Sequence, residues 1–159
     1  MTTETLLPHI DELNAPFWEG CKEGVLRMQQ CPATGRLMFP PREVNSWTPG
    51  TPAVWTEVSG RGRIWSVIEP HPPLMLNFTE LAPYNAIIVE LEEDPSIRVP
   101  GNLVPAVGDA INSIAYDDIE IGAAVEVVFE KMPDDIVLPR WILANIDPEQ
   151  AAVRRLAAQ

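Results

Sequence analysis

Seventeen prolines are spread along this chain of 159 residues, and they restrict the architectures that it can adopt. A proline inside a helix removes a backbone hydrogen bond and clashes with the preceding turn. A proline in a central strand removes a bond of the sheet. We therefore predict many turns, short strands and irregular connections, and no long helices.

Six short segments have the residue pattern of β-strands, with β-branched and aromatic residues between turn signals. They are residues 54–58, 64–68, 84–92, 97–104, 124–131 and 138–144. Gly60 and Gly62 lie between the first two segments, where glycine favours a bulge or the strong coiling of a small barrel. Helices do not alternate with these segments. The predicted fold class is therefore mainly β, an OB-fold-like small barrel.

An N-terminal helix is predicted over residues 16–29, before the barrel. Pro16 suits the first turn of a helix, where a missing N–H has no consequence. The apolar residues that follow at helical spacing are Phe17, Cys21, Val25 and Met28. A short C-terminal helix is predicted within residues 147–159, with Asp147 as its cap and Pro148 in its first turn.

Cys31 opens a segment, residues 31–53, that has the spacing of a zinc ribbon without its ligands. Tetrahedral structural zinc takes four thiolate or imidazole ligands, usually from two Cys-x2-Cys knuckles. The four knuckle positions here hold Cys31, Thr34, Asn45 and Thr48. Three ligands are missing, so we expect no zinc and interpret Cys31 as a small buried hydrophobe. Apolar packing should hold the segment instead, through Leu37, Phe39, Val44 and Trp47.

Charge and hydropathy limit the classes of function. The net charge of −12 argues against nucleic acid, whose phosphate backbone attracts a basic surface. No stretch approaches the roughly 18 apolar residues needed to cross a bilayer, and the first residues lack the pattern of a signal peptide. We expect a cytoplasmic protein with reduced thiols. No nucleophile elbow, phosphate loop or two-histidine metal spacing occurs, so no catalytic residue and no metal ligand is predicted.

Several short motifs follow one another in an order that resembles one family. They are residues 17–20, 24–31, 35–42, 55–62, 82–84 and 133–140. Over residues 14–144 the chain resembles the acyl-CoA-associated family that combines an N-terminal helix, a rubredoxin-like zinc ribbon and an OB-fold, the domain of unknown function 35. The missing ligands depart from that family pattern, so its zinc is not carried over.

The resemblance implies an accessory subunit in a hetero-oligomer with a thiolase-like protein. The partner would carry the catalytic residues, and the two chains would share a CoA thioester substrate, with no cofactor held tightly. We favour a retro-aldolase that cleaves a CoA-thioester side chain of steroid type. The alternative is an accessory subunit of an acetyl- or acyltransferase of thiolase type. A remote alternative is an OB-fold that binds single-stranded nucleic acid.

The predicted organisation has four parts, and the candidate contacts fall in the third. The parts are an N-terminal lead and helix (1–30), the degenerate ribbon (31–53), the OB-fold domain (54–146) and a helical tail (147–159). The candidate contacts to CoA or to the partner are Arg61, Arg63, Arg140 and Trp141. The candidates for a partner surface or acyl channel are His71, Leu74, Met75 and Phe78, in a proline-rich loop. The alternatives are exposed arginines on a barrel bulge, and a loop that folds onto its own barrel.

Overall fold

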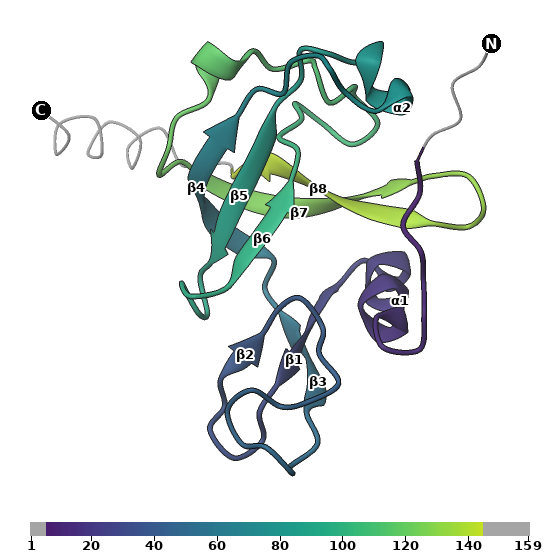
Figure 1. Ribbon diagram of the computed structural model, residues 1–159. Coiled ribbons are helices and arrows are strands. Elements are labelled where there is room, and N and C mark those ends of the chain that lie inside the picture. Colours follow the sequence, from purple (N-terminus) through teal and green to yellow (C-terminus); the bar gives the residue numbers. More distant parts are fainter. Residues whose placement is uncertain (1–5, 145–159) are drawn as a thin grey trace, which may run out of the picture.

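The computed structural model describes residues 6–144 and contains two β-sheets and an N-terminal helix (Figure 1). The helical elements are α1 (Ala15–Glu23), α2 (Leu76–Thr79) and the 3-10 turn η1 (Tyr116–Asp118). The strands are β1 (Leu26–Gln30), β2 (Leu37–Met38), β3 (Val54–Val58), β4 (Arg61–Ile68), β5 (Ala86–Leu91), β6 (Arg98–Gly101), β7 (Ala124–Lys131) and β8 (Val137–Leu143). The helix predicted within residues 147–159 lies outside the described residues.

The larger sheet is antiparallel, with strand order β6-β5-β4-β7-β8, and it curls until its two ends meet. Leu103, just after β6, forms a parallel bridge to Trp141 of β8. The Val104 N–H donates to the Trp141 carbonyl at 2.8 Å, and the Trp141 N–H donates to the Asn102 carbonyl at 3.0 Å. This seam joins the sheet into a small barrel, which confirms the predicted mainly β, OB-fold-like class.

The interior of the barrel is apolar and closely packed. Its buried side chains include Ile64, Ile87, Val89, Leu91, Val99, Val125 and Trp141. The bounds predicted for β3 and β7 are confirmed, and the other strands differ from prediction by a few residues. β4 begins at Arg61, so Gly62 lies inside a strand. Pro139 is on the last strand of the sheet order, where its missing N–H is tolerated.

The smaller sheet has the order β2-β1-β3. β3 pairs with β1 along its whole length, from Leu26 opposite Val58 to Gln30 opposite Val54. The predicted division grouped β3 with the barrel, but its hydrogen bonds go to the ribbon sheet. Strand pairing is a long-range choice that the residue pattern of one strand does not specify.

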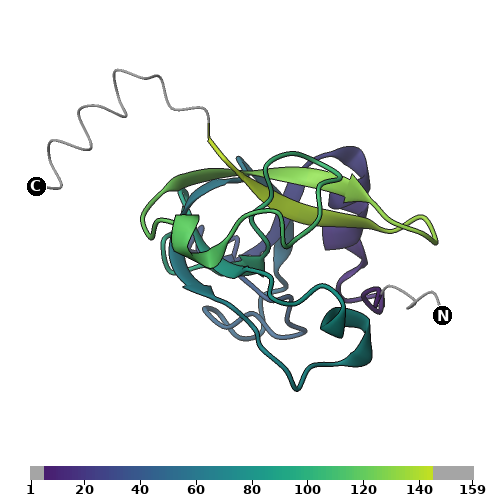
Figure 2. The same cartoon turned by 90° about the horizontal axis from the view of Figure 1, so that it is seen from above.

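The helix α1 connects the two sheets. It packs against both β1 and β8, and Figures 1 and 2 show the β7–β8 hairpin extending over it. Lys22 of α1 forms an ion pair with Asp135 at the hairpin turn, with Nζ 2.6 Å from the carboxylate oxygen. The helix therefore supports the ribbon sheet on one side and the hairpin on the other.

The helix predicted over residues 16–29 is too long, because the observed helix ends at Glu23. Gly24 adopts a left-handed conformation with φ of 78°, and the Val25 N–H closes the last turn on the Gly20 carbonyl at 2.9 Å. The chain then enters β1, whose alternate residues Leu26 and Met28 are buried. A glycine in the left-handed region ends a helix at little conformational cost, and pairing on both edges of β1 stabilises the strand instead.

Candidate functional site

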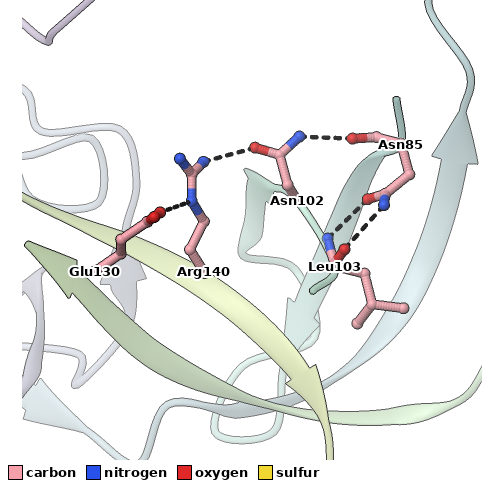
Figure 3. Close-up of polar contacts among 5 residues, drawn as sticks. All are labelled: Asn85, Asn102, Leu103, Glu130 and Arg140. Carbon is pink, nitrogen blue, oxygen red and sulfur yellow. Dashed lines mark hydrogen bonds and ion pairs between the residues drawn. The ribbon is translucent and has the colours of Figure 1, made fainter. Parts of the chain in front are cut away.

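Arg140 lies in a row of polar contacts at the seam where the barrel closes (Figure 3). Its Nε donates to Oε2 of Glu130 at 2.6 Å, and its Nη1 donates to Oδ1 of Asn102 at 2.8 Å. The two charged side chains are only 15% and 18% exposed. Strands β7 and β8 and the residue after β6 thus hold one guanidinium in a fixed orientation. This partly buried bond between charged groups is stronger than a surface pair.

Asn85 anchors the other end of this row (Figure 3). Its carbonyl accepts from Nδ2 of Asn102 at 2.6 Å. Its own side chain is buried, accepts from the Leu103 N–H at 2.7 Å and donates to the carbonyls of Leu103 and Ile111 at 2.9 and 3.1 Å. A buried amide with its donors and acceptor used in this way is rigid. Asn85 therefore ties the chain after β6 and the following loop to the start of β5.

A groove of about 410 Å³ lies beside this polar row. Arg140, Glu130 and Asn102 are part of its polar lining, which also includes Asn77, Glu80 and Asp109. Its apolar lining residues are Leu6, Phe78, Leu81, Ile111, Met132 and Leu138. The structure therefore brings together two predicted residues, Arg140 and Phe78, from opposite ends of the barrel sequence. Sequence reasoning missed Asn102 and Glu130, because a polar residue in a strand or turn carries no local sign of its partner.

Arg61 and Arg63 lie in a different groove, of about 290 Å³, with Glu90 and Glu92. Nε of Arg61 lies 2.7 Å from Oε2 of Glu92. Nη1 of Arg63 donates to the Gly122 carbonyl at 3.2 Å. These arginines are not joined to Arg140, and the nearby carboxylates oppose the binding of a phosphate.

The prediction that Trp141 contacts CoA or a partner is wrong for this chain. The Trp141 side chain is fully buried in the barrel, and Gly101 lies so close that a Cβ there would be 2.7 Å from the indole ring. Among the described residues its indole N–H has no hydrogen-bond partner. The aromatic residue next to an arginine on β8 therefore fills the core, because the side chains of successive strand residues point to opposite faces.

The proline-rich loop presents apolar side chains to the surface. Leu74 is partly buried, whereas Met75 is 61% exposed and Leu76 of α2 is 82% exposed. His71 is exposed, with Nε2 2.9 Å from a Glu69 carboxylate oxygen. The loop therefore does not bury its apolar tip in its own barrel, and Leu76 joins the predicted surface residues.

The four ribbon positions come together, but three of them lack the side chains of zinc ligands. The Sγ of Cys31 lies 3.4 Å from Oγ1 of Thr48. The buried Asn45 side chain accepts from the N–H groups of Trp47 and Thr48 at 3.0 and 3.2 Å and donates to the Thr51 carbonyl at 3.1 Å. One thiol, two hydroxyls and a committed amide do not supply the ligands that zinc requires. Within residues 6–144 no cluster of three or more His, Cys, Asp or Glu residues is placed to hold a metal.

The residues predicted to hold the ribbon by apolar packing are only half right. Leu37 is buried and Phe39 partly buried, but Val44 is 62% exposed and Trp47 is 39% exposed. The Trp47 indole N–H donates to the Leu37 carbonyl at 3.1 Å. Because Val44 is exposed, its side chain buries little apolar surface. The turn that was expected to be held by apolar packing is therefore held by the hydrogen bonds of Asn45.

Hydrogen bonds from Thr34 and then Thr48 lower the pKa of Cys31 to about 6, against the opposing effect of burial. Because this is below the ordinary thiol value of about 8.5, ionisation should stabilise the fold increasingly between about pH 6 and pH 8.5, and this contribution is lost as the pH falls through 6. Ultraviolet absorbance of the thiolate in a Cys21→Ala variant should show a midpoint of about 6.

Cys21 is removed in this experiment because burial raises its pKa to about 12. Thr48→Val should raise the midpoint, since it deletes one hydroxyl that stabilises the thiolate. An ordinary thiol midpoint in both proteins would contradict the proposed hydrogen bonding.

The fold and the polar seam define a ribbon-plus-OB-fold protein. Residues 55–130 match the family model "ChsH2, C-terminal OB-fold domain", and residues 18–44 match "ChsH2, rubredoxin-like zinc ribbon domain". A solved chain in the "Ltp2-ChsH2(DUF35) aldolase" is 30% identical, with a TM-score of 0.67, and the match covers 87% of this chain and 99% of that one. The chain therefore belongs to the ChsH2 family of zinc-ribbon and OB-fold domains, the domain of unknown function 35.

Two curated relatives are longer proteins. The "Probable enoyl-CoA hydratase alpha subunit" of Thermomonospora curvata is 31% identical over 83% of this chain and 38% of its own length. The "3-oxo-4,17-pregnadiene-20-carboxyl-CoA hydratase alpha subunit" of Mycobacterium tuberculosis is 30% identical over 84% of this chain and 37% of its own length. The chain thus spans less than half of either relative. None of its described helices is long and apolar enough to cross a membrane.

Proposed function

We propose that this protein is an accessory subunit of a thiolase-like acyl-CoA complex, a retro-aldolase that cleaves the side chain of a CoA thioester of steroid type. The observation that carries the proposal is the match to a chain of the Ltp2-ChsH2(DUF35) aldolase, which this chain covers over 99% of its length. The name of the Mycobacterium tuberculosis relative supports the substrate class. The hydratase activity in that name is not transferred, because the match covers only 37% of that protein.

The exposed tip of the proline-rich loop is the surface that we assign to the partner. Met75 and Leu76 are 61% and 82% exposed and lie at the start of α2, which Figure 1 shows at one end of the barrel. Soluble proteins seldom leave clustered apolar side chains uncovered. Covering them with a thiolase-like subunit would bury this apolar surface and fix the loop.

The groove beside Arg140 is the part of the CoA entrance that we assign to this chain. It adjoins α2, because Asn77 and Phe78 of that helix are part of its lining. Arg140 uses one N–H group on Glu130 and one on Asn102, and a guanidinium has five. The remaining donors suit carbonyl oxygens of a bound thioester chain. Glu130 offsets the positive charge, so Arg140 orients such a ligand more than it attracts an anion.

The proposed division of labour leaves the chemistry to the partner. His71 is an exposed residue whose ion-pair partner is Glu69. A general base also needs a substrate within hydrogen-bond reach. The role of this chain is to order the partner and shape the entrance.

The proposal predicts that the purified chain alone has no lyase or thiolase activity and that turnover appears when the thiolase-like protein encoded beside it is added. Co-purification followed by mass spectrometry should recover both chains. Leu76→Asp should weaken the complex about 10-fold or more, because it places a charge in the apolar contact. Val44→Asp is the matched control, since Val44 is 62% exposed on the ribbon.

Turnover by the isolated chain would exclude an accessory role. A partner that carries a nucleophilic cysteine and forms C–C bonds would favour the acyltransferase alternative. Equal weakening by Leu76→Asp and Val44→Asp would show that α2 is not the specific contact.

A further inference from the structure

A groove of about 300 Å³ lies on the ribbon, facing the connection between β5 and β6. We call it the ribbon groove and define it by Arg36, Arg42, Ser46 and Trp47. Leu37, Met38, Phe39, Ser96 and Ile97 complete its lining, which contains no carboxylate. Figure 1 shows the β5–β6 connection reaching towards β2 at this position. The groove is therefore formed between the two sheets, away from Arg140.

The charge of this lining is unusual for the molecule. Three other grooves on the described residues each carry two or three carboxylates. These are Glu90 and Glu92 in the groove of Arg61, Glu80, Asp109 and Glu130 in the groove of Arg140, and Glu57, Glu93 and Asp94 in a third groove that also touches Arg36. The whole chain has 23 acidic and 11 basic residues. A groove with two arginines and no acid is thus the opposite of the general charge of the protein.

Arg36 is held in place by an aromatic ring. Its guanidinium carbon lies 3.4 Å from the centre of the Trp47 ring, and the Trp47 indole N–H is fixed on the Leu37 carbonyl. Stacking occupies one face of a guanidinium and leaves the N–H donors at its edge. Within residues 6–144 the Arg36 side chain has no ion pair and no hydrogen-bond acceptor.

Arg42 is anchored through its backbone. The buried Gln29 side chain accepts from the Arg42 N–H at 2.7 Å and donates to the Arg42 carbonyl at 3.0 Å. The Arg42 guanidinium makes no ion pair or hydrogen bond with any described residue. By contrast, Arg27, Arg61, Arg98 and Arg140 are each paired with a glutamate.

We propose that the ribbon groove binds the phosphate or diphosphate group of a nucleotide-type ligand. Two guanidiniums that line one groove repel each other unless an anion lies between them. The edge donors of Arg36, the free donors of Arg42 and the Ser46 hydroxyl match the several oxygens of a phosphate. The groove has the size of a small-ligand site, at the lower end of the usual range of about 300–1,000 Å³.

The surroundings define which side of Arg36 the ligand uses. The Ser96 hydroxyl donates to Asp94 at 2.5 Å, so it is not a free donor. Asp94 lines the acidic groove that also touches Arg36, together with Glu57 and Glu93, and these carboxylates repel an anion. The ligand therefore lies between Arg36 and Arg42. This inference stands on the ribbon groove alone and does not depend on the proposed function.

Isothermal titration calorimetry with the full chain tests the proposal, using ADP, CoA, inorganic pyrophosphate and adenosine. ADP should bind, and adenosine should bind at least about 10-fold more weakly, because charge-assisted hydrogen bonds supply the affinity. Arg36→Gln and Arg42→Gln should each weaken ADP binding about 10-fold or more. Arg61→Gln, which removes a paired arginine from another groove, should have no effect. CoA and pyrophosphate separate the sources of the phosphate. CoA binding tighter than ADP binding indicates a ligand of CoA type, whereas pyrophosphate binding without ADP or CoA binding indicates a free anion and overturns the proposal.

Arg36→Lys is the second variant, because it keeps the positive charge. If stacking of Arg36 on Trp47 stabilises the fold, this variant should disturb the fold less than Arg36→Gln does. Its affinity for ADP should lie between those of the wild type and Arg36→Gln. Absence of ADP and CoA binding by the wild type, equal binding of adenosine, or an equal loss in Arg61→Gln would each overturn the proposal. The proposal would also be overturned if the ribbon groove bound an acidic protein partner and none of the phosphate ligands. If the complex with the thiolase-like subunit forms and turns over while the ribbon groove binds no phosphate, this inference fails and the proposed function remains.

Discussion

Gly62→Ala should lower the free energy of unfolding by about 3 kcal/mol. An added Cβ would lie 2.3 Å from the Glu90 carbonyl oxygen and 2.6 Å from a Val89 methyl carbon. The carbonyl belongs to the backbone of β5, so it cannot move aside as the end of a flexible side chain can. Gly62 is also paired with Leu91 on one side and Val125 on the other. The strand therefore has no direction in which to relax, and chemical denaturation should show a lower midpoint.

Gly108→Ala is the matched control for this effect. Gly108 has a φ of +89°, and a Cβ there would have no atom within 4 Å. Its replacement should cost about 1 kcal/mol through backbone conformation alone. Equal losses in the two variants would show that close approach at Gly62 does not matter to the barrel.

Asn45→Ala should lower the free energy of unfolding by about 2–3 kcal/mol. The change leaves the N–H groups of Trp47 and Thr48 and the Thr51 carbonyl without the partner that they have in the folded chain. Asn45 is 3% exposed, so water does not readily replace it. Ser46→Ala is the control, since Ser46 is exposed and its replacement should stay within about 0.5 kcal/mol.

Measurements of stability with a chelator, together with metal analysis, distinguish a ribbon held by hydrogen bonds from one held by a metal. A chelator should leave the stability of the wild type unchanged, and metal analysis should find far less than one zinc per chain. A variant with Thr34→Cys, Asn45→Cys and Thr48→Cys combined should bind zinc and become sensitive to the chelator, because metal binding would then contribute to folding. Close to one zinc per wild-type chain would contradict the assignment of Asn45.

Local sequence determined where several strands lie, in both sheets. The residue patterns of Val54–Val58 and Ala124–Lys131 predicted both strands with the bounds that the structure has. A β-strand with one buried face shows alternating apolar and polar residues in the sequence, and prolines and glycines mark the turns between strands. The missing ligands at Thr34, Asn45 and Thr48 were equally visible, because a zinc site requires particular residue types.

The candidate site depended on contacts that no local pattern contains. Arg140 and Phe78 line the same groove although they are 62 residues apart in the sequence. Trp141 had the residue type of a surface anchor, but the closure of the barrel buries it. In the same way, Arg36 and Arg42 line one groove, and Gln29 of β1 holds the backbone of Arg42 there.

The sequence by itself determined the class of fold, the absence of the zinc ligands and the family, since these depend on residue type, period and motif order. The tertiary structure alone decided where α1 ends, which sheet takes β3 and which arginines have no carboxylate partner within residues 6–144. These outcomes follow from strand pairing and from burial between distant segments, whose free energies are not properties of any short stretch of chain. The clearest case is Arg36 and Arg42, whose side chains have no ion pair with any described residue of this acidic protein.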